Sequence, residues 1–220
     1  STYIHRYAVV PGQRALVMTC NDSGYQTALD IHATKRTLVA VVDARHQGAG
    51  RLAQLVKEAG IEVITGHGVI EAFGGKAVTG AVIAPLNETA EQVVGAGRSI
   101  SCDLIAVAGG WSPVVHLSCH TGSRPVWNQQ IAGFVPGSTL QKQYCAGAIM
   151  GQYSLAQVLT SGAVVGAEAA VVPVPVATFD CGDEDDTEAT AQTMFLIPHS
   201  KPVSRAPKQF VDLQNDVTAA

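Results

Sequence analysis

The sequence predicts an α/β protein in which buried parallel strands alternate with helices and are followed by a small antiparallel meander. Three short apolar runs, at residues 15–20, 37–43 and 61–65, are typical of strands that are covered on both faces. Helical stretches at residues 24–34 and 50–59 lie between them. Because the connections are short, this order predicts parallel pairing with right-handed crossovers, which is half of a nucleotide-binding sheet.

Turn-forming residues mark the ends of these elements. Asn21-Asp-Ser-Gly24 suits a tight turn that leads into a helix N-cap, and Gly60 stands where the end of a helix favours glycine. Residues 67–73, 77–85 and 97–100 are short strand candidates with glycine-rich turns between them, which predicts the antiparallel meander.

A further buried strand is predicted at residues 102–110. It ends in Gly109 and Gly110, which allow a ligand to approach the backbone closely and are therefore candidate cofactor-binding residues. Residues 143–147 are predicted to form another strand, and a helix rich in small residues follows from about residue 154 to 170.

The composition argues against several classes of protein. Of the 220 residues, 47% are hydrophobic and 15% are charged, which disfavours a disordered chain, a coiled coil or a collagen-like chain. The net charge of −4 provides no basic field for phosphate backbones, so we expect no nucleic-acid partner. Because no apolar run reaches the roughly 18 residues of a membrane span, we expect no membrane association. Five cysteines without a CxxC pair favour reduced thiols in a cytoplasmic protein.

Acidic residues gather in one stretch. Residues 173–193 hold six acidic side chains and no Lys or Arg, which predicts a solvated linker. A calcium-binding loop is the alternative, but the stretch lacks the alternating oxygen ligands and central glycine of such a loop. We therefore expect a first domain over residues 1–120, a second part over 121–172, the linker over 173–193 and an extended tail over 194–220.

The turn after the first strand is a candidate nucleotide site. Such a turn points backbone N–H groups at a pyrophosphate from a helix N-terminus, and an acidic residue at the end of the next strand binds the ribose hydroxyls. Asn21, Asp22 and Ser23 occupy the turn, and Asp43 ends the next strand. The glycine fingerprint is missing, however, and Asp22 would place a negative charge beside a phosphate. The alternative is that Asn21 or Asp22 only caps the helix.

A second candidate nucleotide site is the bend formed by Gly147 and Ala148, together with Ser154 at the start of the next helix. A strand, a Gly-Ala bend and a helix of small residues can also aim N–H groups at a phosphate, and a plain helix–sheet crossover is the equal alternative. No catalytic residue is predicted, because the chain lacks a G-x-S-x-G elbow and its histidines are scattered. His116, Cys119 and His120 lack a fourth ligand, so no metal site is predicted.

Three blocks of residues carry a resemblance to a known family. They are residues 21–25 with 41–45, residues 102–117, and residues 208–218. All resemble the alpha subunit of heterotetrameric sarcosine oxidase, and the resemblance covers essentially the whole chain. It implies an internal segment that follows the first dinucleotide-binding half of that subunit and precedes its folate-binding, aminomethyltransferase-like domain.

The resemblance also implies a fold and a domain arrangement. The fold would be the three-layer nucleotide-binding fold, NAD(P)H-domain-like, of reductases that contain two dinucleotide-binding domains. Residues 1–120 would be the inserted NAD(P)-binding-like domain, and residues 121–172 the returning C-terminal part of the first dinucleotide-binding domain. The tail would lead to the next domain.

The implied activity is the oxidative demethylation of sarcosine to glycine, formaldehyde and hydrogen peroxide by a flavin-dependent complex. The alpha subunit would hold NAD, the complex would hold FMN and FAD, and the partners would be the beta, gamma and delta subunits. This segment would lack the amine-oxidising residues and be inactive by itself, with a homodimer as its possible isolated form. The Gly147-Ala148 bend departs from the Gly-Asp of FAD-binding relatives, whose carboxylate accepts hydrogen bonds from the ribityl chain, which favours NAD there. The alternatives are a non-catalytic α/β scaffold and the alpha subunit of a related amino-acid or opine dehydrogenase.

Overall fold

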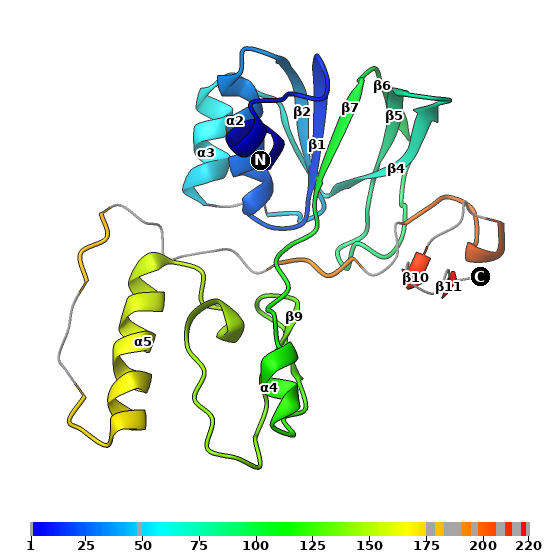
Figure 1. Ribbon diagram of the computed structural model, residues 1–220. Coiled ribbons are helices and arrows are strands. Elements are labelled where there is room, and N and C mark those ends of the chain that lie inside the picture. The colour runs from blue at the N-terminus through cyan, green and yellow to red at the C-terminus, as the bar shows by residue number, and fades with distance from the viewer. Residues whose placement is uncertain are drawn as a thin grey trace. The chain divides into compact units, whose positions relative to one another are not determined.

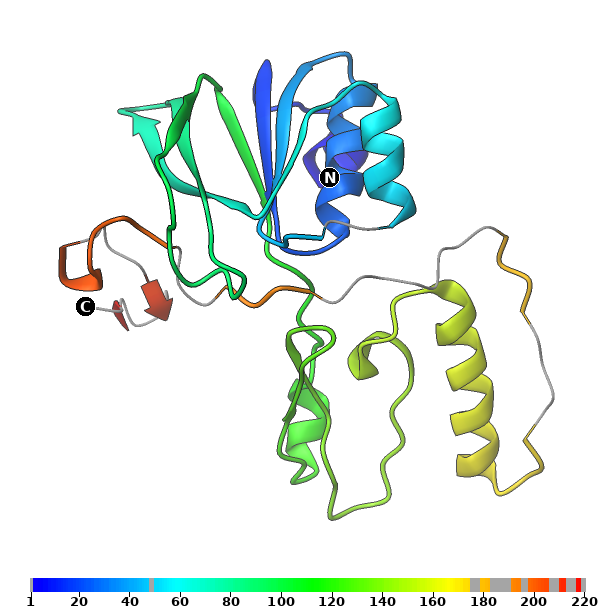
Figure 2. The ribbon, with the colours of Figure 1, turned by 180° about the vertical axis from the view of Figure 1, so that it is seen from behind.

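Two sheets and one layer of helices build the first part of the chain, as Figures 1 and 2 show from opposite sides. The chain divides into two units, Ser1–Gly110 with Ala191–Ala220, and Trp111–Thr190. The predicted domain boundaries at residues 120, 172 and 193 stay predictions. The computed structural model describes residues 2–47, 50–174, 179–182, 191–194, 198–205, 210–212 and 217–218. Most of the predicted acidic linker lies outside the described residues.

The central layer of the first unit is a parallel sheet with the strand order β3-β2-β1-β7. Its strands are β1 (Arg14–Thr19), β2 (Thr37–Asp43), β3 (Val63–Thr65) and β7 (Leu104–Ala108). Helices α2 (Ser23–Ala33) and α3 (Arg51–Glu58) cover one face, where an apolar cluster that includes Val17, Tyr25 and Val56 is buried. The predicted strand–helix alternation and parallel pairing are therefore confirmed.

An antiparallel sheet covers the other face. It consists of β4 (His67–Gly74), β5 (Val78–Pro85) and β6 (Arg98–Ile100), paired in that order. A second apolar cluster, which includes Leu16, Val42 and Ile83, fills the space between the two sheets. The first unit thus has three layers, as predicted: helices, a parallel sheet and an antiparallel meander.

The position of a strand in the sheet explains how deeply it is buried, and the backbone conformation of the following residue explains where a helix ends. β1 is buried from Ala15 to Thr19 because it is a central strand with both faces covered. Gly60 follows α3 with φ +76°, a left-handed conformation that glycine adopts without strain and that ends the helix. The prediction of a buried strand at residues 102–110 is only partly right. β7 lies at the edge of the sheet, and Val107 is 67% exposed there.

The N-terminal helix α1 (Thr2–Tyr7) lies beside α2. His5 Nε2 lies 2.9 Å from Asp30 Oδ2, and the Asp30 carboxylate, on α2, is nearly buried. Gln26 Nε2 donates to the other oxygen of Asp30 at 2.9 Å. These contacts tie the beginning of the described chain to the helical layer.

The second unit contains short elements and one long helix. They are α4 (His116–His120), the antiparallel pair β8 (Val126–Asn128) and β9 (Gly133–Val135), the 3-10 turn η1 (Gly147–Met150) and α5 (Leu155–Ala170). The prediction of a strand at residues 143–147 is wrong, because a strand needs a neighbour to pair with, and the strands described in this unit, β8 and β9, pair with each other. The predicted helix is confirmed, with Ser154 as its N-cap.

The described residues from 191 onward belong to the first unit, and residues 191–193, the end of the predicted solvated linker, are half-buried there. They include residues 191–194, the 3-10 turn η2 (Val203–Arg205) and a short antiparallel pair, β10 (Phe210–Asp212) with β11 (Val217–Thr218). Within the described part of the chain, the helices are all too short or too polar to cross a membrane.

Candidate functional site at the carboxyl edge of the parallel sheet

Three strands of the parallel sheet end side by side. In the strand register, Thr19 of β1 faces Asp43 of β2 on one side and Ala108 of β7 on the other. The sheet order reverses direction between β1 and β7, and sheets of this kind bind ligands outside the carboxyl ends of the strands at such a point. The predicted candidate residues that follow or end these strands all fall at this edge: Asn21, Asp22, Ser23, Asp43, Gly109 and Gly110.

The Asn21 side chain bridges the gap between β1 and β7. Its Nδ2 atom donates to the carbonyl oxygen of Ala108 at 3.0 Å, and its Oδ1 atom accepts from the backbone N–H of Ser23 at 3.0 Å and from the Ser23 hydroxyl at 2.5 Å. Only 7% of Asn21 is exposed. Asp22 occupies the N-cap position of α2 but makes no capping hydrogen bond with its side chain. Asn21 therefore satisfies the start of the helix, as the capping alternative proposed.

The turn also packs tightly against the strand that precedes it. Gly24 lies over Thr19, and a Cβ atom at Gly24 would lie 2.3 Å from the Thr19 Cβ atom. The Thr19 hydroxyl donates to the carbonyl oxygen of Asn21 at 2.6 Å and accepts from the Asn21 N–H at 3.2 Å. Only a glycine at position 24 permits this close approach of helix to strand.

A buried cluster of charges lies at the end of β2. Asp43 is fully buried, and its carboxylate accepts from the Tyr25 hydroxyl at 2.7 Å, from the Arg45 N–H at 2.9 Å and from Arg45 Nη2 at 2.8 Å. Arg45 Nη2 also donates to Asp22 Oδ1 at 2.7 Å. The Arg45 Nη1 atom is buried, and the described residues supply no acceptor for it. A ribose hydroxyl could reach Asp43 only by displacing these donors.

The electrostatics of the edge favour a structural role. Burial, followed by the charge of Asp43, raises the pKa of the Tyr25 hydroxyl. Burial by itself would lower the pKa of Arg45, but its hydrogen bonds and charge interactions with Asp43 and Asp22 outweigh that effect and raise the pKa. Burial also raises the pKa of the Cys20 thiol. Tyr25 and Cys20 therefore stay protonated and Arg45 stays charged near neutral pH, so these three side chains supply no general base.

Sequence reasoning missed Arg45 and Tyr25. The spacing of Arg45, two residues after Asp43, was a usable signal, because a cation there can fold back onto the carboxylate that ends the strand. Tyr25 gave no such signal, since only the packing of α2 against the sheet brings its hydroxyl to Asp43.

The second candidate site lies in the other unit. Gly147 has φ +75°, and its N–H donates to Gln152 Oε1 at 3.1 Å and to Ser161 Oγ at 3.3 Å. Ala148 lies in η1. The Ser154 hydroxyl accepts from the N–H of Gln157 at 3.2 Å and so caps α5. The structure brings these candidates into one stretch, and whether they or the residues of the first edge bind a cofactor stays a prediction.

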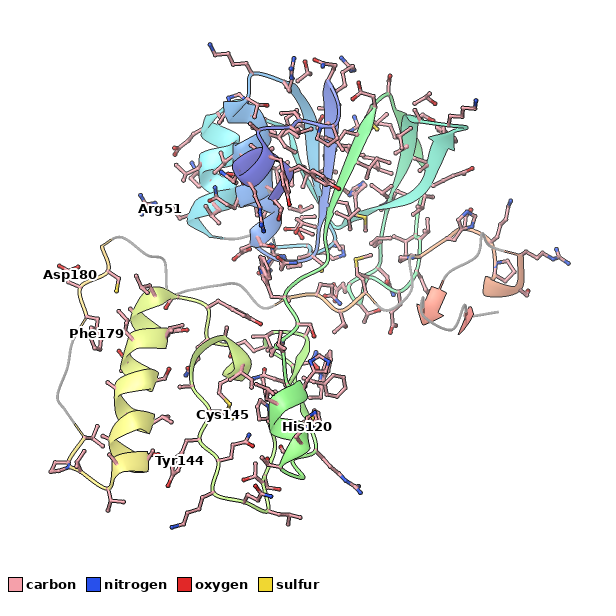
Figure 3. The ribbon with its side chains drawn as sticks, viewed as in Figure 1. Arg51, His120, Tyr144, Cys145, Phe179 and Asp180 are labelled. Atoms are coloured by element: carbon pink, nitrogen blue, oxygen red, sulfur yellow. The ribbon has the colours of Figure 1, made fainter. Side chains whose placement is uncertain are left out.

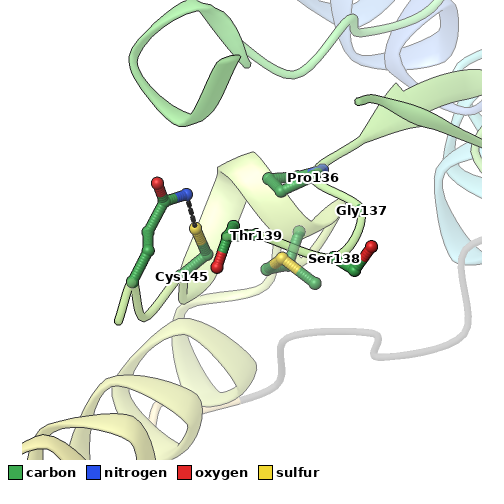
Figure 4. Close-up of a pocket in the computed structure, with 7 residues that line it drawn as sticks. Pro136, Gly137, Ser138, Thr139 and Cys145 are labelled. Atoms are coloured by element: carbon green, nitrogen blue, oxygen red, sulfur yellow. Dashed lines mark hydrogen bonds between the residues drawn. The ribbon is translucent and has the colours of Figure 1, made fainter. Parts of the chain in front are cut away.

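A pocket lies near this stretch (Figure 4). Its volume is about 290 Å³. Cys145, which is labelled in Figure 3, is one of the residues that line the pocket. Gln143 Nε2 donates to Cys145 Sγ at 3.2 Å, and the Thr121 hydroxyl is hydrogen-bonded to Gln143 Oε1. The pocket is lined by Pro136, Gly137, Ser138, Thr139, Gln143, Cys145 and Met150, a set without a charged side chain. Across the described residues, no group of three or more His, Cys, Asp or Glu side chains is placed to hold a metal ion.

Comparison with curated proteins identifies the relatives of the chain. It is 33% identical to the sarcosine oxidase alpha subunit of Corynebacterium sp. (strain P-1) over 100% of its own length, and 35% identical to that of Rhizobium meliloti (strain 1021) over 98%. Over its whole length, the chain is similar to a segment of sarcosine oxidase alpha subunits. It spans 23% and 20% of the length of these two relatives. No protein-family model matches the sequence.

Solved structures share the fold of this chain. LpdA from Mycobacterium tuberculosis matches with a TM-score of 0.53 and 14% identity, over 77% of this chain and 37% of that protein. The flavoprotein disulfide reductase RclA of Escherichia coli, solved as a Cu(II) complex, matches with a TM-score of 0.50 and 14% identity, over 72% of this chain and 36% of that protein. At this identity the comparison shows the fold alone. It confirms the predicted fold class, which the chain shares with LpdA and RclA.

Proposed function

We propose that this chain is part of the alpha subunit of a sarcosine oxidase, a complex that oxidatively demethylates sarcosine to glycine, formaldehyde and hydrogen peroxide. The observation that carries the proposal is the identity of 33% and 35% to two sarcosine oxidase alpha subunits over nearly the whole chain. We place the complex in the cytoplasm, and the five cysteines, all free thiols, support this. The amine-oxidising residues are proposed to lie on another chain, so that the segment by itself is inactive.

The proposed cofactor of the intact subunit is NAD, held at the bend that contains Gly147 and Ala148, with FMN and FAD elsewhere in the complex. A methyl group at Ala148 cannot accept hydrogen bonds from a ribityl chain, and NAD has no ribityl chain to accommodate. Gly147 has no side chain, so it adopts φ +75° without strain and lets a ligand approach the backbone of this bend. At the carboxyl edge of the first unit, Asn21 is hydrogen-bonded to Ala108 and Arg45 is hydrogen-bonded to Asp43. Groups that a dinucleotide would need there are therefore already bonded within the chain.

The second unit is proposed to dock against the remainder of the longer subunit. α5 has 16 residues, and Ala167 is the one that is buried. Leu155 is 50% exposed and Leu159 38% exposed, and a Cβ atom at Gly162 or Gly166 would meet no described residue within 4 Å. An apolar helix of this kind requires cover, and the relatives, which are four to five times longer, supply chain for it. The beta, gamma and delta subunits are the proposed partners of the assembled complex, and a homodimer is the proposed state of the isolated segment.

A segment exchange tests the proposal. In the Corynebacterium alpha subunit, the matching segment is replaced by this chain, and the product is expressed with the other subunits of that enzyme. We expect an assembled complex by size-exclusion chromatography that releases hydrogen peroxide from sarcosine and yields NAD on extraction. The matched control carries the Rhizobium segment instead. Assembly and activity with the control segment but not with this chain would contradict the proposal.

A non-catalytic scaffold is the second candidate function, and the closed edge around Asn21 and Arg45 favours it for the first unit. It predicts an exchanged complex that assembles fully but contains no NAD. A related amino-acid or opine dehydrogenase is the third candidate. Its signature would be amine-dependent reduction of a dye without release of hydrogen peroxide.

A further inference from the structure

A short segment far along the chain lies across the carboxyl edge of the parallel sheet. We name residues 191–194, which are all half-buried, the strap. The N–H of Gln192 donates to the carbonyl oxygen of Cys20 at 2.8 Å, directly after β1. The side-chain Nε2 of Gln192 donates to the carbonyl oxygen of Thr89 at 2.9 Å, in the loop after β5. In Figure 1, the strap runs in orange beneath the lower, carboxyl ends of the strands.

Met194 anchors the end of the strap by apolar contacts. It packs against a cluster formed by Cys20, Ala44, Leu86 and Ala90, and also against the cluster between the two sheets. The first of these clusters joins the ends of β1 and β2 to the loop after β5. Met194 therefore fills a space between the parallel sheet and the antiparallel meander, and Cys20 beneath it is only 4% exposed.

Two hydrogen bonds from Gln192 and the half-buried, apolar side chain of Met194 hold the strap at the carboxyl ends of the strands. The same edge is where folds of this type receive a dinucleotide. In this chain, the Cys20 carbonyl bonds the strap, the Asn21 amide bonds β7, and the Asp43 carboxylate bonds Arg45 and Tyr25. The backbone and side-chain groups that would hold a ligand are thus in use by the chain itself.

We propose that the carboxyl edge of the parallel sheet is a docking site for the chain's own strap, and that it takes this peptide segment in place of a dinucleotide. The strap fastens the end of the predicted linker to the first unit, so that the chain beyond it starts from a fixed point. Because the strap is part of the same chain, docking is intramolecular and needs little intrinsic affinity. This proposal goes beyond the proposed function and stands whether or not the segment exchange succeeds.

Thiol labelling of the full 220-residue chain tests the docking, with Cys20 as the reporter. The double variant Gln192→Ala with Met194→Ala is treated with N-ethylmaleimide, and each cysteine is followed by peptide mass spectrometry. Loss of the strap should expose Cys20 and speed its labelling about tenfold. The matched control is Lys201→Ala, an exposed position beyond the strap, which should label like the wild type. Unchanged labelling of Cys20 in the double variant would overturn the docking.

Cys102, which is 2% exposed between the two sheets, reports general opening of the first unit. If the double variant labels at both Cys20 and Cys102, the single variant Gln192→Ala, which retains the packing of Met194, decides the matter. Faster labelling at Cys20 alone in that variant supports the strap, and equal labelling at both thiols refutes it.

A dinucleotide arm tests the second half of the proposal. We expect NAD⁺ to leave the labelling of Cys20 in the wild-type chain unchanged, because the strap already occupies the carboxyl edge of the parallel sheet. Faster labelling with NAD⁺ would show that the dinucleotide displaces the strap, and slower labelling would show that it binds over Cys20. Either result would overturn the proposal, and neither would bear on NAD binding at the bend of the second unit.

Discussion

Substitution of Arg45 by methionine tests the role of the buried charge cluster most directly. Arg45 is 6% exposed, and its guanidinium bonds the carboxylates of Asp43, which is fully buried, and of Asp22. Methionine has a similar length but no charge, so the Arg45→Met variant leaves Asp43 buried without its cation. The Tyr25 hydroxyl would remain as a donor to that carboxylate.

The expected loss of stability follows from the burial of the ion pair between Arg45 and Asp43. Removing one partner of a buried ion pair costs about 3–5 kcal/mol, because the remaining charge is neither solvated nor compensated. At about 4 °C per kcal/mol for a domain of this size, the expected loss in Tm is about 12–20 °C. Adding Asp43→Asn should recover about 2 kcal/mol or more, because the amide carbonyl still accepts from Tyr25 and no charge is left at the fully buried position 43.

The assay is urea unfolding followed by far-UV circular dichroism. Both tryptophans, Trp111 and Trp127, lie in the second unit, so their fluorescence does not report on the cluster. The control is Arg98→Met. The ion pair between Arg98 and Glu62, at 3.2 Å, is more than half exposed on both sides and is worth about 0–1 kcal/mol. If Arg45→Met were no more destabilising than Arg98→Met, the cluster would not hold the edge together.

Three further predictions concern single positions. Gly24→Ala should lower the free energy of unfolding by about 1–3 kcal/mol, because its Cβ atom would lie 2.3 Å from that of Thr19, whereas the control Gly75→Ala, open to solvent, should change it little in the same urea assay. Gly162→Ala, exposed on α5, should raise the helix stability of the isolated chain by about 0.8–1 kcal/mol, and a thermal melt with no gain would contradict this. The backbone N–H groups of Arg14 and Gln13 donate to the Asp103 carboxylate and hold its pKa below the ordinary 3.8. The stability that these hydrogen bonds contribute to the fold is therefore present above pH 3.8 and is lost as the pH falls through the lowered pKa. Asp103→Asn should therefore lower Tm at pH 7, and the difference from the wild type should shrink in acid, whereas a constant difference would refute the assignment.

Much of the fold was predictable because its signals are local. The apolar run at residues 37–43 became β2 with the same bounds, and the glycine-separated runs became the meander β4-β5-β6. Gly60 ended α3 because only a left-handed residue closes that turn easily. Patterns of this kind depend only on residues that are close together in the sequence, so they can be recognised without the structure.

The failures concern long-range context. Residues 143–147 have the composition of a strand, yet none of the strands described in the second unit pairs with them. Residues 104–108 do form a strand, but its place at the sheet edge leaves Val107 exposed. Apolar composition predicts a preference for burial, whereas burial itself depends on which other elements arrive to cover the strand.

The location of the candidate site was predictable, but its contents were not. Strands of a parallel sheet end at a common edge, so Asn21 and Asp43 were predicted to form one site, and Gly110 lies at the same edge beside Asn21. Whether that edge is open was undecided by the sequence. Arg45 and the strap decided it, by contacts that no spacing along the chain reveals.

The sequence by itself determined the order of strands and helices, the parallel and antiparallel halves of the first unit and the edge where their ends meet. Only the tertiary structure decided that this edge is filled, with Asn21 bonded to β7, Arg45 held between Asp22 and Asp43, and Gln192 bonded to Cys20. The physical reason is that secondary structure follows from the periodicity of nearby residues. The occupancy of a crevice instead depends on hydrogen-bonding groups from distant segments, which become neighbours only after the chain has folded.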